Sequence, residues 1–166
     1  MPGDRDPWRE LLARHGPGLV LFARQWVSSA TDAEDAVQDG FIRFWQARSR
    51  ARADVGYLYA CVRTAAMDLS RSGHRREKRE ATFGAPARNS VPAFSPEHAE
   101  LASAVEASLA KLPPEQREVI VMKIWGGLTF SQIARAAGIG VNTAASRYRY
   151  ALERLERELS KEVARD

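Results

Sequence analysis

Carboxylates gather in one short stretch of the sequence, where they could form a docking surface. Residues 28–47 contain four acidic side chains against the single base Arg43. At helical spacing these groups cluster on one part of a helix surface. With a nearby amide, the set comprises Asp32, Glu34, Asp35, Gln38 and Asp39. It fits either a surface for a basic partner or acids that favour a helix start and face solvent.

A basic stretch follows directly along the chain. Residues 48–80 contain nine basic against four acidic side chains. Guanidinium groups bind the phosphates of nucleic acids, and Tyr57 and Tyr59 could stack on unpaired bases. The alternatives are a solvated charged surface and tyrosines half-buried in a core. The stretch therefore indicates, without requiring, a polyanionic partner.

A third set of polar residues lies on a helix that follows a glycine turn. Thr129-Phe130-Ser131-Gln132 predicts a capping box that starts a short helix, and Gly138 can take the positive φ of a tight turn. A long helix from about residue 141 would then offer its first turns to the major groove. The outward candidates, with Arg147 added for phosphate or guanine, are Asn142, Thr143, Ala145, Ser146, Arg149 and Tyr150. The pattern is typical of a helix-turn-helix, the alternative being a plain helical hairpin.

The elements that must position these residues are all predicted to be helices, because no strand-like alternation of useful length occurs. We expect helices near residues 8–27, 31–48, 55–72, 97–112, 113–125, 129–137 and 141–163. Gly16-Pro17-Gly18 should break or kink the first, Thr31 and Glu34 should cap the second, and Gly73 should end the third. The last helix should bury a stripe of Tyr148, Leu152, Leu155 and Leu159.

A proline-containing stretch with little charge and no periodicity separates the two helical parts. Residues 81–96 contain three prolines and predict a flexible linker. The fold class is therefore all-α, with two small helical domains at residues 1–80 and 97–166 and a helix-turn-helix in the second.

Composition excludes several classes of function. The 166 residues include one cysteine, Cys61, so an intramolecular disulfide is excluded and a reducing cytoplasm is the simplest location. No apolar run approaches the roughly 18 residues of a membrane span, and no signal peptide is visible. Three scattered histidines give no metal-ligand cluster. Without a P-loop or a nucleophile–base set, we expect no enzyme, cofactor or small-molecule substrate.

Taken together, these pieces resemble the sigma factors of bacterial RNA polymerase in the sigma-70 superfamily, specifically the extracytoplasmic-function (ECF) group. TDAEDAVQDGFIRFWQ is similar to the family pattern AED-x-x-Q-x-x-F-x-x-x-W of region two. YLYACVRTAAMDLSR is similar to the segment after it, with Asp68 and Arg71 matching but Tyr57 in place of tryptophan and Thr64 in place of asparagine. Residues from Leu109 to Leu155 are similar to region four, with NTAASR in place of the commoner gTVkSR.

The resemblance implies a role for each set of residues. Promoter DNA at the minus-thirty-five element would meet Asn142, Thr143, Ala145, Ser146, Arg147, Arg149 and Tyr150. The minus-ten element would meet Arg48, Arg50, Arg52, Tyr57, Arg63 and Arg71. The clamp of the polymerase core would meet Asp32, Glu34, Asp35, Gln38, Asp39 and Phe41. The linker would lie in the RNA path of the polymerase, and an anti-sigma factor is a further implied partner.

Two other classes of function compete with this interpretation. A stand-alone helix-turn-helix regulator that binds duplex DNA as a dimer would explain residues 99–160 but leaves the acidic helix without a role. An adaptor that binds only protein would tolerate alanine at Ser146, Arg147 and Arg149.

Overall fold

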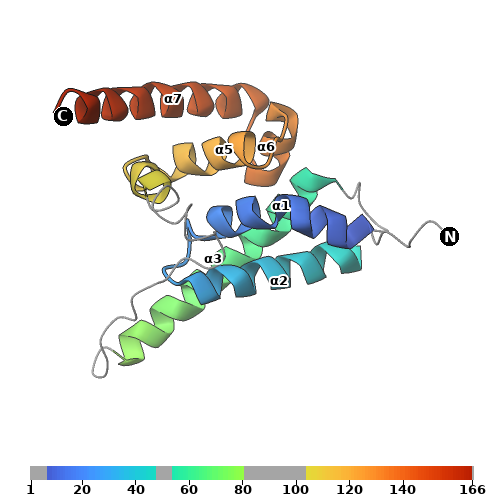
Figure 1. The fold of residues 1–166 in the computed structure, drawn as a ribbon. Helices are drawn as coiled ribbons and strands as arrows, with labels where there is room; N and C mark the ends of the chain where they lie inside the picture. Colours follow the sequence, from blue (N-terminus) through green and yellow to red (C-terminus); the bar gives the residue numbers. More distant parts are fainter. Residues whose placement is uncertain (1–6, 48–53, 81–103, 166) are drawn as a thin grey trace.

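The computed structural model describes residues 7–47, 54–80 and 104–165, and within these ranges every regular element is a helix. The helices form two groups that lie one above the other, with the N-terminal group below and the C-terminal group above (Figure 1). The predicted all-α fold is therefore confirmed. The whole of the predicted linker at 81–96, and the start of the helix expected at 97–112, fall outside the described residues.

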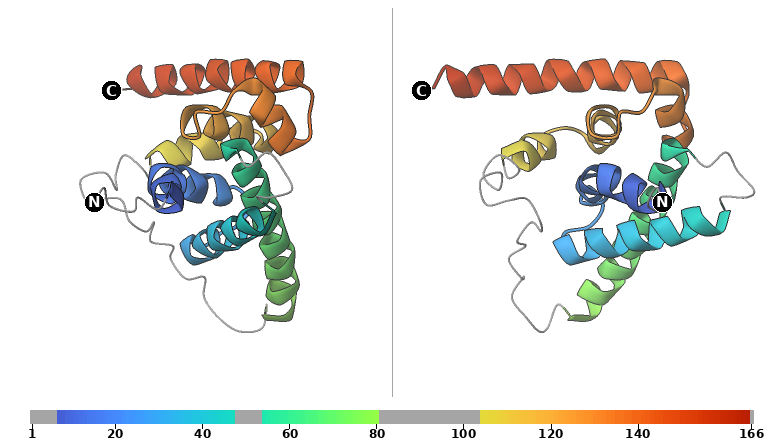
Figure 2. Two further views of the ribbon diagram at one scale, coloured as in Figure 1. Left: turned by 90° about the vertical axis from the view of Figure 1, so that its right-hand side faces the viewer. Right: turned by 45° about the vertical axis from the view of Figure 1, so that its right-hand side comes forward.

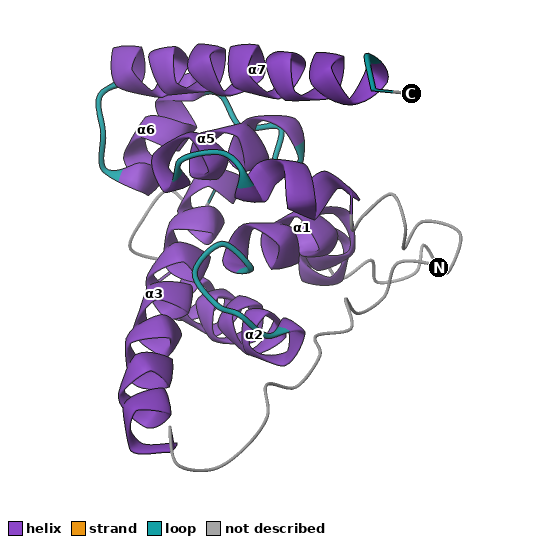
Figure 3. Cartoon of the chain, turned by 90° about the vertical axis from the view of Figure 1, so that its left-hand side faces the viewer, coloured by secondary structure: helices purple, strands orange, loops and turns teal. Residues whose placement is uncertain are grey.

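The N-terminal group comprises α1 (Pro7–Ala23), α2 (Ala30–Ala47) and α3 (Val55–Glu80). Helix α2 packs closely on α3, whose N-terminal end reaches α6 of the upper group (Figure 3). At the crossing of α2 and α3, a Cβ placed on Gly40 would lie 2.6 Å from both Cα and Cγ2 of Val62. Only glycine allows the two backbones to approach this closely, so Gly40 sets the spacing between the two helices.

Three predicted boundaries in this group were wrong. Pro17 lies inside α1, which continues past it and ends at Ala23 rather than near Val27. Helix α3 continues through Gly73 to Glu80. Helix α2 is capped by Ser29, whose Oγ accepts a hydrogen bond from the Asp32 N–H at 3.0 Å, and not by Thr31. Packing of an apolar face stabilises a helix more than local propensity does, which explains why Pro17 did not end α1. A single glycine inside a helix costs only about 1 kcal/mol relative to alanine, so Gly73 need not end α3.

The C-terminal group contains a helical segment at residues 104–110, then α5 (Pro114–Ile124), α6 (Phe130–Ala137) and α7 (Val141–Val163). Helix α7 lies across the top of the other helices, and its C-terminal part extends beyond them (Figure 2). The predicted core stripe on α7 is therefore only partly correct. Tyr148 and Leu155 are half-buried, whereas Leu152 and Leu159 are 40% and 53% exposed.

The apolar core is continuous through both groups. Tyr59 of α3 is completely buried, with its ring centroid 5.0 Å from that of Phe22. A Cβ on Gly18 would lie 2.8 Å from the Tyr59 hydroxyl, and one on Gly126 would lie 3.1 Å from Cζ of the same ring. Tyr59 thus inserts between α1 and the turn that follows α5, and it joins the two groups.

The described residues lack two features that other functions would need. None of their helices is long and apolar enough to cross a membrane. They also contain no group of three or more histidine, cysteine, aspartate or glutamate side chains placed to hold a metal ion.

We predict that Gly40→Ala lowers the free energy of unfolding by about 1–3 kcal/mol, because its methyl group would overlap the Val62 backbone. Gly73→Ala is the matched control: it also lies inside a helix, but nothing is within 4 Å of its Cβ position. The control should raise stability by about 0.5–1 kcal/mol. Urea denaturation followed by circular dichroism measures both, and equal effects of the two changes would contradict the close crossing.

Candidate nucleic-acid interface

Two capping arrangements fix the helix-turn-helix locally. The Thr129 Oγ1 accepts from the Gln132 N–H at 3.1 Å, and the Gln132 side chain accepts from the Thr129 N–H at 2.9 Å. Gly138 ends α6 in the left-handed conformation, with φ of 68°. The Ile139 N–H then donates to the Ala134 carbonyl at 3.0 Å and closes the turn. The predicted capping box and glycine turn are both confirmed.

The first turns of α7 present a polar face. Residues at positions i, i+1, i+4, i+7 and i+8 share one side of a helix. On α7 this side carries Asn142, Thr143, Ser146, Arg149 and Tyr150. All of these are exposed except the half-buried Ser146, whereas Ala144 and Ala151 on the opposite side are completely buried. We call these five residues the α7 face; its width and chemistry suit the edges of bases in a major groove.

The two arginines near this face differ in position. The guanidinium of Arg149 lies 5.1 Å from the ring of its neighbour Tyr150, so the two side chains form one exposed cationic and aromatic surface. Arg147 is half-buried, and its charge acts on the buried carboxylate Glu118 of α5. Ala145 is half-buried beside the α7 face. Arg149 is therefore better placed than Arg147 to contact DNA.

The three described residues among those predicted for the minus-ten element differ in exposure and contacts. Arg48, Arg50 and Arg52 lie outside the described residues. Tyr57 is half-buried, with its ring centroid 5.9 Å from that of Phe44. Arg71 is exposed, while Arg63 is in an ion pair with Glu118. Among the described members of this set, only Arg71 is exposed.

A buried thiol lies beside Tyr57. The Cys61 side chain is among the core residues, with 8% of the residue exposed. Burial raises the pKa of this thiol, although a hydrogen bond with Tyr57 and the charge of Arg43 act in the opposite direction. Burial, together with Cys61, also raises the pKa of the Tyr57 hydroxyl. These two groups stay neutral and belong to the core, in agreement with the interpretation of Cys61 as a small apolar residue.

The acidic set on α2 divides into exposed and engaged members. Asp32, Glu34, Asp35 and Gln38 are exposed. Asp39 is paired with Arg43 at 2.9 Å, and the same guanidinium reaches Asp68 of α3 at 3.1 Å. Phe41 is half-buried and packs against the core. We call the four exposed residues the α2 acidic face.

Sequence reasoning missed a group of residues that links the two halves. Glu118 is a buried acid on α5, and Asp54, Gln132 and Arg135 form hydrogen bonds between the start of α3 and α6. One signal was available for Glu118, because it lies three and four positions before the apolar Val121 and Met122 and so shares their side of the helix. Nothing local marked its partner Arg63, which lies 55 positions earlier.

Comparison with known protein families gives two matches that together span most of the chain. The model of sigma-70 region 2 matches residues 11–77, and the model of sigma-70 region 4 matches residues 102–155. The first contains most of α1, the α2 acidic face and most of α3, and the second contains the helix-turn-helix.

Individual relatives agree with these matches. The ECF RNA polymerase sigma factor SigM of Mycobacterium tuberculosis is 32% identical over 161 residues, which cover 95% of this chain and 79% of SigM. The ECF RNA polymerase sigma factor RpoE of Cereibacter sphaeroides is 29% identical over 164 residues, with 95% and 88% covered. This chain therefore belongs to the sigma-70 family of RNA polymerase sigma factors, in its ECF group.

Solved structures show the same fold. The sigma factor RpoE of Bartonella quintana, in complex with the anti-sigma factor NepR, superposes with a TM-score of 0.68 at 23% identity, covering 93% of this chain and 97% of RpoE. CnrH, in complex with the cytosolic domain of CnrY, superposes with a TM-score of 0.66 at 25% identity, with 96% and 91% covered.

We predict that Arg149→Ala weakens binding of the chain to duplex DNA that carries its upstream promoter element. A single base-reading arginine contributes about 1–3 kcal/mol, so the dissociation constant should rise roughly 5- to 150-fold. Arg154→Ala is the control, since Arg154 is also exposed on α7 but lies five residues beyond Arg149, about 140° around the helix from it and past the first turns.

Fluorescence anisotropy with a labelled duplex measures the dissociation constants of Arg149→Ala and Arg154→Ala. In a pull-down, both variants should bind core polymerase as the wild type does. Equal loss in the two variants would contradict the assignment of the α7 face.

Proposed function

We propose that this chain directs bacterial RNA polymerase to promoters and supports their opening. Its relatives are named as ECF RNA polymerase sigma factors, which fits this role. The observation that carries this proposal is the presence of both family regions in one chain, with an exposed α7 face on the second and an exposed α2 acidic face on the first. A polymerase factor needs both surfaces, because it must hold a protein and read DNA at the same time.

The two surfaces divide the work by their chemistry. The α7 face combines amide, hydroxyl, guanidinium and phenol groups, which can read base edges in the minus-thirty-five element. Arg71 and the basic residues that precede α3 would contact the minus-ten DNA, mainly through phosphates. The α2 acidic face would dock on a basic surface of the polymerase clamp. Two modules of modest affinity gain from each other once one partner holds both at a fixed separation.

Several further features belong to the same proposal. Promoter opening requires capture of unpaired bases, not covalent chemistry, so we propose that the chain acts without catalytic residues or a cofactor. Its place of work would be the cytoplasm, where the polymerase is. An anti-sigma factor is a fitting regulator, since both structural relatives were solved with a protein of that kind or with a partner's cytosolic domain. The relatives favour this function over a dimeric helix-turn-helix regulator.

The decisive experiment is transcription in vitro with the purified chain, bacterial core polymerase and a library of genomic DNA fragments. The expected result is initiation at a defined set of start sites that share upstream elements. Core polymerase alone is the control. No binding to core polymerase, or binding without selective initiation, would refute the proposal.

We predict that Asp35→Lys lowers the affinity for core polymerase at least tenfold, because it reverses a charge in the centre of the α2 acidic face. The fold should persist, since exposed substitutions of this kind change stability by about 0.5 kcal/mol or less. Glu10→Lys is the matched control: it makes the same change of charge at an exposed position of α1. Surface plasmon resonance measures binding, and equal affinities for the two variants would remove the docking assignment.

A further inference from the structure

The two halves of the chain are joined by an ion pair at the edge of the shared core. Arg63 of α3 donates from Nε to Glu118 Oε1 of α5 at 2.7 Å, and from Nη2 to Oε2 at 3.4 Å. The contact is therefore two-pronged, which is the geometry that a guanidinium uses with a carboxylate or a phosphate. The Glu118 side chain is 9% exposed and that of Arg63 is 28% exposed.

The buried carboxylate depends on this partner. Burial raises the pKa of Glu118, although the charges of Arg63 and Arg147 act against that rise. A carboxylate held away from water without a partner is strongly disfavoured. If Arg63 moved to another anion, Glu118 would have to regain water, and it can do so when α5 separates from α3.

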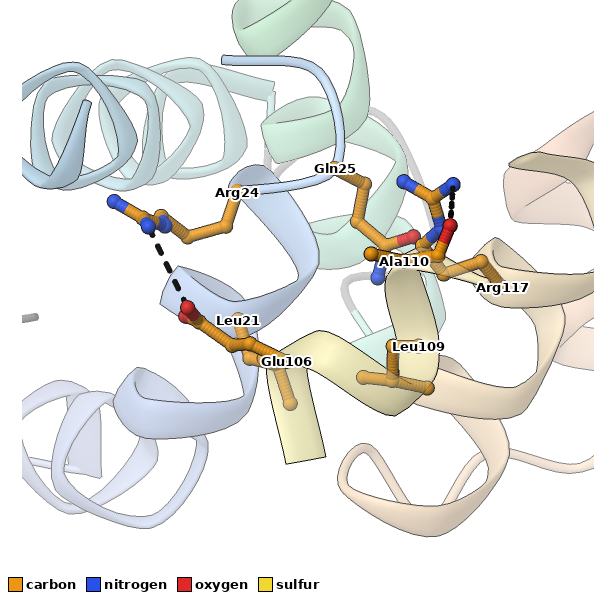
Figure 4. Close-up of a pocket in the computed structure, with 7 residues that line it drawn as sticks. All are labelled: Leu21, Arg24, Gln25, Glu106, Leu109, Ala110 and Arg117. Atoms are coloured by element: carbon orange, nitrogen blue, oxygen red, sulfur yellow. Dashed lines mark hydrogen bonds and ion pairs between the residues drawn. The ribbon is translucent and has the colours of Figure 1, made fainter. Parts of the chain in front are cut away.

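Further polar contacts follow the same boundary. Asp54 at the start of α3 accepts hydrogen bonds from Gln132 of α6 at 3.3 Å and from Arg135 at 3.0 Å. On the other side, Arg24, directly after α1, pairs with Glu106 at 3.5 Å, beside a cavity of about 170 Å³ between the two halves (Figure 4). All of these contacts connect the region that precedes residue 81 with the region that follows residue 103.

Arg63 is also one of the residues that the sequence assigns to DNA phosphates. A guanidinium that binds both oxygens of Glu118 cannot bind a phosphate in the same way. We propose that Glu118 acts as an internal substitute for a DNA phosphate: it occupies Arg63 in the free chain, holds the two halves closed, and must release Arg63 before the first half can engage promoter DNA. The DNA part of this inference rests on the proposed function, whereas the closed arrangement of the free chain does not.

The test compares Glu118→Lys with the matched control Glu115→Lys, both in the full chain. Glu115 lies on the same helix but is exposed, so the control adds the same charge without touching Arg63. Spin labels at Ser72→Cys and Arg157→Cys, both exposed, report the separation of α3 and α7 in a Cys61→Ala background. Pulsed electron paramagnetic resonance then measures the distance distribution without polymerase or DNA.

For Glu118→Lys we expect a longer and broader distance distribution. The affinity for a minus-ten DNA fragment should rise on the order of tenfold, because the binding-competent state would rise from about a tenth of the population to most of it. Glu115→Lys should keep the wild-type distances and gain far less affinity. We call the Arg63–Glu118 ion pair, in its proposed role of holding the two halves closed, the latch. Wild-type distances in Glu118→Lys would overturn it. Opening without a gain of affinity over Glu115→Lys would overturn the competition for Arg63.

A second pair of changes decides the question if Glu118→Lys fails to fold. A Cβ on Gly56 would lie 3.0 Å from Cβ of Gln132, close enough for a disulfide after a small shift. In the Cys61→Ala background, Gly56→Cys with Gln132→Cys should lock the halves together when oxidised. The oxidised chain should bind the minus-ten fragment about tenfold more weakly than the same chain after reduction. Equal binding, or no specific binding in either state, would overturn the masking of Arg63.

Failure of the proposed function would look different from failure of the latch. If the chain were not a polymerase factor, the transcription experiment would give no selective initiation, yet the distances in the free chain would still respond to Glu118→Lys. If only the latch were wrong, selective initiation would remain and the distances would not change.

Discussion

The insertion of Tyr59 between Gly18 and Gly126 is the contact on which the arrangement of the two halves depends. The ring is completely buried, and both glycines leave just enough room for it. Its hydroxyl has no hydrogen-bond partner among the described residues, and burial raises its pKa far above the ordinary value. Apolar burial therefore brings the halves together, and the surrounding ion pairs orient them, since a buried pair adds little net stability by itself.

Several charged residues serve the fold rather than a partner. Arg63, Arg43 and Asp39 were identified in the sequence by charge alone, yet each forms a contact within the protein. Asp35 on α2 and Arg149 on α7 are exposed and form no ion pair within the described part of the chain. These are charges to which the proposed function assigns polymerase docking and DNA contact.

Sequence reasoning succeeded where the signal was local. Thr129, Gln132 and Gly138 lie within ten positions of one another, and their side-chain chemistry specifies a cap and a turn before any tertiary contact forms. It was wrong about helix ends at Pro17 and Gly73: packing against other helices outweighed the local preference at Pro17, and a single glycine is too small a cost to end a helix at Gly73. For the cap of α2, Ser29 and Thr31 are equally good candidates two positions apart, and local pattern cannot choose between them.

The candidate site shows the same limit. The α7 face could be predicted because a single helix carries it, and the helical period alone places its residues on one side. The pairing of Arg63 with Glu118 could not, since it joins positions 55 apart whose meeting depends on how two groups of helices pack. Leu152 and Leu159 matched a core stripe by spacing but are exposed, although Ala151 and Leu155 between and beside them are buried or half-buried. The C-terminal part of α7 extends beyond the other helices (Figure 2).

The position of Cys61 has a consequence for how the chain senses its surroundings. Oxidants react with the thiolate form of cysteine, and burial beside Tyr57 keeps this sulfur protonated and shielded. It is the only sulfhydryl in the 166 residues. Disulfide stress therefore has no accessible thiol on this polypeptide, and any response of transcription to that stress would have to reach it through another molecule.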